Sequence, residues 1–171
     1  MKKQQYIKHI VVAAMCFFTI LQACKQSPSA ASGSGSSNEA PGLCLADTII
    51  YPVLIKNNDP YDTWTEQCLS RLERAKFVEQ IFDAVYKHKA KAYSYNTHEE
   101  LSISEVKDIE KQPDFSRDKV AKLQFWETWH FDEQQLIMTK KVQAILLAYE
   151  YLSEDGELRG YKAAFYIKLK E

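Results

Sequence analysis

The chain has 171 residues, of which 46% are hydrophobic and 12% aromatic, and its formal net charge is −1. This length allows one domain with a sizeable core. Basic and acidic residues are interspersed along the chain, whereas nucleic-acid binding requires a clustered basic face, so the composition argues against a nucleic-acid partner.

The N-terminus has the layout of an export signal. Three lysines within the first eight residues precede the apolar run Ile10–Leu21, and Cys24 follows shortly after. A membrane-spanning helix needs roughly 20 residues, so this run is too short to span a bilayer. The ending Leu-x-Ala-Cys resembles the lipobox of bacterial lipoproteins, in which the cysteine carries lipid after cleavage. We therefore predict that residues 1–23 are a signal peptide and that Cys24 is lipidated.

The segment after the predicted lipidation site has the composition of a tether. Serine, glycine, alanine and proline dominate Lys25–Gly42, and no apolar period is present. Such a segment behaves as a flexible linker, with a root-mean-square reach of roughly 23 Å for its length. We expect residues 24–42 to tether a single folded domain, residues 43–171, to the membrane.

The domain is expected to begin with a strand. Leu43–Lys56 is apolar and rich in β-branched residues. Proline cannot donate a hydrogen bond to a neighbouring strand, so Pro52 places this strand at a sheet edge or breaks it. The polar stretch that follows, with a proline at position 60, predicts a turn.

A helix is predicted next. Thr63 and Glu66 fit a capping box, in which each side chain satisfies a backbone donor of the first turn. Apolar residues then recur at steps of three and four as far as about Lys87, which indicates one helical face. A single globular helix of this length is unusual, so a break is expected near Glu73.

Two short elements follow. Ala90–Tyr95 is aromatic and short, which favours a strand. Ser102 and Glu105 form a second capping-box pattern at the start of Ile103–Lys111, so a short helix is expected there, and Pro113 ends it.

The last third of the chain predicts an antiparallel meander. Lys122–Phe131 and Tyr161–Leu169 alternate between apolar and polar residues, as half-buried strands do. Ile137–Tyr151 fits a helix nearly as well as a strand, but the tight turn before Tyr161 favours a strand partner. We therefore expect an α+β fold, with helices on one face of a small antiparallel sheet and with Tyr161, Phe165 and Ile167 facing the helices.

Two cysteines remain in the predicted domain. A bridge between Cys44 and Cys68 would close a loop of about 25 residues and stabilise the fold by roughly 3 kcal/mol. The alternative is a pair of buried free thiols, and the sequence does not distinguish between the two. No cysteine or histidine spacing typical of zinc is present, so we expect no metal site.

The sequence offers little catalytic chemistry. Glycine is absent from 43–155, which excludes glycine-rich phosphate loops there, and we expect no cofactor. Glu127 lies on the apolar side of its strand, so it is either a general acid or base or a structural carboxylate paired with a lysine on the next strand. The structural interpretation is favoured, because no second catalytic group stands at a diagnostic spacing. Trp126, on the polar side, either covers a second layer or is exposed to anchor a partner.

A recognisable pattern runs through Phe125–Ile145. Its residues are, in order, Glu127, Trp129, Phe131, Asp132, Met138, Lys141, Val142 and Ile145. Together with the upstream helix, this pattern resembles the gliding-motility and type IX secretion ring protein family known as GldN/PorN, over about Trp64–Leu169. Lys141 stands where the family usually has arginine. Because it occupies the family's basic position, we expect it to form a structural ion pair with Glu127.

The resemblance implies a non-enzymatic component of a secretion or gliding apparatus at the periplasmic side of the outer membrane. It implies protein partners, namely a secretion-ring lipoprotein and inner-membrane-linked motor or core subunits, and is compatible with an oligomer. Trp126, Trp129 and Asp132 are the candidate partner-binding residues. The alternative is a lipid-anchored ligand-binding or hydrolytic lipoprotein, with Glu127, Trp126 and His130 in one cleft.

Overall fold

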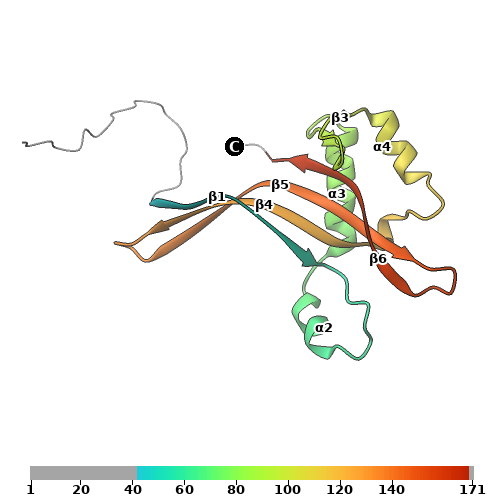
Figure 1. Cartoon of the computed structure of the whole chain (residues 1–171), viewed down its shortest axis with the longest axis horizontal. Helices are drawn as coiled ribbons and strands as arrows, with labels where there is room; N and C mark the ends of the chain where they lie inside the picture. The colour runs from blue at the N-terminus through green and yellow to red at the C-terminus, as the bar shows by residue number, and fades with distance from the viewer. Residues whose placement is uncertain (1–41, 170–171) are drawn as a thin grey trace, which may run out of the picture. The chain divides into compact units, whose positions relative to one another are not determined.

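The computed structural model describes residues 42–169 (Figure 1). The predicted signal peptide, the lipidation site Cys24 and the tether lie outside these residues. The elements are, in chain order, β1 (Leu43–Leu54), α2 (Thr63–Leu69), α3 (Arg74–Tyr86), β2 (Ala92–Tyr93), β3 (Glu100–Leu101), α4 (Ile103–Glu110), the short 3-10 helix η1 (Arg117–Lys119), β4 (Val120–Asp132), β5 (Ile137–Leu152) and β6 (Leu158–Lys168).

The strands form one antiparallel sheet, in the order β1-β4-β5-β6-β2-β3. The last three strands of the chain are neighbours in space, so the predicted C-terminal meander is confirmed. The ambiguous segment is strand β5, as predicted. Together with the helices, this sheet confirms the α+β fold.

The core lies between α3 and one face of the sheet, and α3 crosses the strands in Figure 1. α3 contributes Phe82, which is fully buried, and β6 contributes Phe165, which is also fully buried. Their rings meet edge to face with centroids 5.1 Å apart. Aromatic pairs prefer this geometry because the positive edge of one ring meets the negative face of the other. Phe165 and Ile167 therefore face the helices, as predicted.

Tyr161 does not face the helices, and this part of the prediction is wrong. The pairing of β5 with β6 shifts between Leu147 and Ala148, which leaves one extra residue, Ala164, in β6. Such a bulge reverses the alternation of side chains along the rest of the strand. The Tyr161 hydroxyl instead lies 3.4 Å from the side-chain amide nitrogen of Asn58.

The helix boundaries follow local capping. The predicted break is confirmed, because α2 ends at Leu69 and α3 begins at Arg74. The first cap was assigned one residue too late: the Asp62 carboxylate, not Thr63, accepts a hydrogen bond from the backbone N–H of Thr65 at 2.9 Å. The second capping box, formed at the start of α4 by the serine and glutamate predicted for it, is confirmed.

Three strands extend beyond the helices as an arm (Figure 1). We define the arm as Leu43–Ile49 of β1, Glu127–Asp132 of β4 and Ile137–Val142 of β5, which pair in that order. Large apolar side chains are exposed along it, namely Leu43, Leu45, Ile137 and Met138, with Leu136 in its turn. No helix among residues 42–169 is long and apolar enough to cross a membrane.

Candidate protein-binding site on the open face of the sheet

Strand β4 presents its two tryptophans to opposite faces of the sheet. Successive residues of a strand alternate between faces, so Trp126 and Trp129 point in opposite directions. Trp129 shares the helix-side face with Leu123, which is buried in the core. Trp126 lies on the other face, which α3 and α4 leave open, and packs there with Leu146 and Tyr166.

A cavity of about 360 Å³ lies on this open face. We call it the Trp126 pocket. Its lining residues are His98, Trp126, Lys141, Val142, Gln143, Ala144, Tyr166, Lys168 and Leu169. They come from β4, β5, the end of β6 and the hairpin between β2 and β3.

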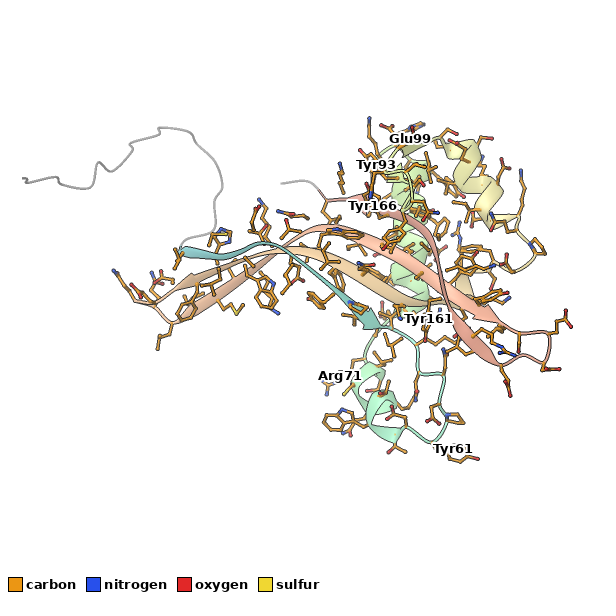
Figure 2. All side chains as sticks on the ribbon, in the orientation of Figure 1. Tyr61, Arg71, Tyr93, Glu99, Tyr161 and Tyr166 are labelled. Atoms are coloured by element: carbon orange, nitrogen blue, oxygen red, sulfur yellow. The ribbon has the colours of Figure 1, made fainter. Side chains whose placement is uncertain are left out.

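Aromatic rings form one side of the pocket. The ring of Trp126 lies 5.4 Å from that of Tyr166, which in turn stacks on Tyr93 with centroids 5.2 Å apart. Figure 2 shows Tyr93 and Tyr166 next to each other. Tyr166 is buried, whereas Trp126 is only half-buried. Rigid rings with part of their surface exposed are typical of protein-binding sites, because they bury large areas at low entropic cost.

His98 reaches the pocket from a tight hairpin. The backbone N–H of Ser94 donates to the Glu99 carbonyl at 2.9 Å, and the His98 N–H donates to the Ser94 carbonyl at 2.9 Å. His98 has a φ of +60°, a left-handed conformation that is uncommon for residues other than glycine. Its Nδ1 lies 3.4 Å from the Tyr166 hydroxyl. The hairpin thus places an imidazole beside the aromatic rings.

The charged groups of the pocket are basic. Lys141 and Lys168 line it, and the Lys168 ammonium lies 4.8 Å from the centre of the Tyr93 ring. No acidic residue is among the lining residues. Within residues 42–169, neither lysine forms an ion pair. A pocket with two such ammonium groups favours an anionic ligand group.

Glu127 belongs to a separate cluster on the helix-side face of the arm. It is only 4% exposed. Its Oε1 accepts a hydrogen bond from the Tyr51 hydroxyl at 2.7 Å, and its Oε2 accepts one from the indole N–H of Trp129 at 2.8 Å. The bond to Glu127, together with burial, raises the pKa of Tyr51. Because donors occupy both carboxylate oxygens, this arrangement fits a structural role.

The predicted ion pair between Glu127 and Lys141 is not formed. Lys141 stands opposite Thr128 in the register of β4 and β5, whereas Glu127 stands opposite Val142. Lys141 therefore lies on the open face, where it lines the Trp126 pocket, and Glu127 lies on the other face. The lysine on the side of Glu127 is Lys140, whose ammonium lies 4.3 Å from the centre of the Trp129 ring.

The cleft expected for a ligand-binding or hydrolytic lipoprotein is also not formed. It required Glu127 and His130 to face one another, but these residues have opposite parity on β4 and lie on opposite faces. A buried acid does pair with a lysine elsewhere: Glu150 is 5% exposed, and its Oε2 lies 2.8 Å from the Lys56 ammonium. No group of three or more potential metal ligands occurs in the described part of the chain.

The other residues that the sequence singled out are Asp132, Cys44 and Cys68. The Asp132 carboxylate accepts hydrogen bonds from the backbone N–H groups of Gln134 and Gln135, at 2.9 and 3.0 Å, and so stabilises the turn at the end of the arm. Cys44 and Cys68 are free and exposed, which matches neither the disulfide nor the buried thiols. They lie in β1 and α2, and both remain available to solvent.

Sequence reasoning missed His98, Tyr166 and Lys168. A signal for two of them was present, because Tyr166 and Lys168 share the polar side of the predicted strand Tyr161–Leu169, where an aromatic residue is unexpected. Nothing local indicates His98, since its place in the pocket depends on the pairing of β2 with β6.

Comparison with known proteins identifies a family. The sequence profile of the family described as gliding motility associated protein GldN matches residues 39–171, which include all the described strands and helices. A search of curated proteins finds no match.

Proposed function

Because the chain belongs to the GldN family of gliding motility associated proteins, we propose that it is a non-enzymatic, lipid-anchored structural component of a gliding motility or type IX secretion complex. The family match carries the assignment to this apparatus, since it extends over all of the described residues. Proteins of this family are components of the secretion apparatus.

The lipid anchor is proposed from the sequence. Lipidation at Cys24 would hold the protein on the outer membrane, at its periplasmic face, and residues 24–42 would let the domain stand off the lipid surface. The domain, and not the tether, would then contact the partner subunits of the apparatus. By family resemblance these partners are a secretion-ring lipoprotein and inner-membrane-linked subunits.

The open face of the sheet is the surface that we assign to a protein partner. Trp126 and Tyr166 present aromatic surface there, in a pocket of about 360 Å³. Helices cover the other face, and donors occupy its buried carboxylate Glu127. Partner binding therefore accounts for Trp126, a residue on the polar side of its strand.

Affinity purification from the native host tests the proposal. Tagged full-length chain should recover subunits of the secretion apparatus from the membrane fraction, identified by mass spectrometry after cross-linking in the intact envelope. Trp126→Ala should reduce that recovery, whereas Trp64→Ala, at a residue 72% exposed on α2, should leave it unchanged. Recovery without any secretion subunit, or equal recovery with both variants, would contradict the proposal.

A further inference from the structure

Among the described residues, part of the edge of β5 beside the Trp126 pocket has no neighbouring strand. β6 pairs with β5 from Ala144 onward, and the backbone N–H of Leu169 donates to the Gln143 carbonyl at 2.8 Å. From Ile137 to Val142, β4 is the only described strand that pairs with β5. The unpaired backbone groups of such an edge can form hydrogen bonds with an added strand.

The pocket and this edge are continuous. Lys141 and Val142 belong to the open edge and also line the pocket. A strand added along β5 would occupy the position that β6 leaves, and its side chains on the open face would point toward Lys141 and Lys168. Acidic side chains there would meet two ammonium groups that have no described acidic partner.

We propose that the Trp126 pocket and the open edge of β5 bind an extended, acidic segment of a partner protein by strand addition. Main-chain hydrogen bonds to Ile137–Val142 supply affinity, and a carboxylate between Lys141 and Lys168 supplies specificity. The inference rests on the proposed function only in taking the partner to be a protein.

The positive charge of the β5 edge favours this acidic occupant over a second copy of the chain. Lys140 and Lys141 are adjacent on the open edge, so two β5 edges paired with each other would bring lysines close to lysines. Like charges on paired strands are destabilising, and lysines at an edge commonly prevent such self-pairing. Of the two, only Lys141 lines the Trp126 pocket, so it attracts the acidic strand as well as protecting the edge.

A direct binding measurement tests the inference on the purified full-length chain in detergent. The probe is a fluorescently labelled octapeptide of alternating valine and glutamate, and its counterpart carries lysine in place of glutamate. We expect fluorescence anisotropy to show saturable binding of the glutamate peptide and none of the lysine peptide. On binding, the backbone amides of Ile137–Val142 should become protected from hydrogen exchange.

Two neighbouring lysines provide a matched pair of variants. Lys141→Glu should weaken peptide binding about tenfold or more, because it removes a charge-assisted contact and adds a repulsive one. Lys140→Glu changes the net charge equally but lies on the helix-side face beside Trp129, and should change affinity less than about threefold. Lys168→Glu, at the other side of the pocket, should weaken peptide binding as Lys141→Glu does. With both variants, the test does not depend on the folding of either one.

Several outcomes would overturn the inference. Equal weakening by Lys140→Glu and Lys141→Glu would mean general electrostatic attraction, and unchanged protection of Ile137–Val142 would exclude strand addition. Competition by free glutamate as effective as by the peptide would indicate a small anion. Sedimentation that shows a dimer lost in Lys141→Glu would identify a second copy as the occupant. If the chain binds the peptide but recovers no secretion subunit, this inference stands and the proposed function is contradicted.

Discussion

Trp129 donates its indole N–H to Oε2 of Glu127 at 2.8 Å, although the two residues belong to the same strand and lie only two positions apart. Tyr51 of β1 donates to the other carboxylate oxygen, so the buried acid connects β1 to β4. The charge of Glu127 is thus satisfied by two neutral donors, with Lys140 above the Trp129 ring.

Replacement of Glu127 should destabilise the domain. Glu127→Leu leaves the Tyr51 hydroxyl and the Trp129 indole without their acceptor, and we expect a loss of about 2 kcal/mol in the free energy of unfolding. Glu127→Gln should cost less, about 1 kcal/mol, because its amide oxygen can accept from the Trp129 indole and its NH₂ can donate to the Tyr51 hydroxyl, which leaves two neutral bonds in place of two bonds to a carboxylate. Urea denaturation of the purified chain measures both losses.

The same experiment tests the partner of Glu127. A double-mutant cycle that combines a Glu127 replacement with Tyr51→Phe should show a coupling energy of about 1 kcal/mol. A cycle that combines the same replacement with Lys141→Gln should show a coupling energy of about zero. Coupling to Lys141 larger than coupling to Tyr51 would restore the ion pair expected from the sequence and contradict the observed register.

Removal of the α4 cap should have a measurable and local effect. The Ser102 hydroxyl accepts a hydrogen bond from the Glu105 backbone N–H at 3.3 Å, and the Glu105 carboxylate accepts one from the Ser102 N–H at 2.7 Å. Ser102→Ala should therefore lower the free energy of unfolding by about 1 kcal/mol. Ser104→Ala, two residues further along the same helix, should leave stability unchanged or slightly higher, because alanine is the better helix former. Equal losses in both variants would argue against the capping box.

Tyr86 should make the domain sensitive to alkali. Burial and the hydrogen bond to Glu110 raise the pKa of Tyr86 to about 12, while Arg117 and Lys107 also face this side chain. In the unfolded chain its pKa is about 10, so between pH 10 and 12 the unfolded state loses this proton more readily than the folded state. Stability contributed by the protonated hydroxyl is complete below pH 10 and falls as the pH rises.

Tyr86→Phe isolates this contribution. The variant should be less stable than wild type at neutral pH, because it lacks the bond to Glu110, but its stability should decline less steeply between pH 10 and 12. Urea midpoints measured at several pH values in this range compare the two slopes. Parallel slopes would show that Tyr86 does not titrate differently in the folded and unfolded states.

Lipidation at Cys24 is tested by Cys24→Ser. Because the thiol is the expected acceptor of the lipid, the variant should lose lipid and accumulate as an uncleaved or mislocalised precursor. Metabolic labelling with a fatty-acid analogue, followed by fractionation, measures both effects. Cys44→Ser, which changes a free thiol in β1, is the control and should label like wild type. Equal label on wild type and Cys24→Ser would contradict the predicted anchor.

The sequence by itself determined the elements whose signals are local. Alternation in Lys122–Phe131 and capping residues at Ser102 and Glu105 depend on neighbours a few positions away, and the observed β4 and α4 agree with them. Residue pattern also determined the family, since the segment that carries the resemblance, about Trp64–Leu169, lies within the profile match over residues 39–171.

Tertiary structure alone decided the face of those side chains of the meander that lie beyond a β-bulge, such as Tyr161 and Lys141. Bulges at Ala164 and beside Val142 insert one residue each, and their positions depend on how the strands twist and pair. One inserted residue moved Tyr161 away from the helices, and the pairing of β4 with β5 set Lys141 on the face opposite Glu127. The Trp126 pocket likewise exists only because β2 pairs with β6 and brings His98 to Tyr166. Local periodicity carries no information on such contacts, because they join residues far apart in the sequence.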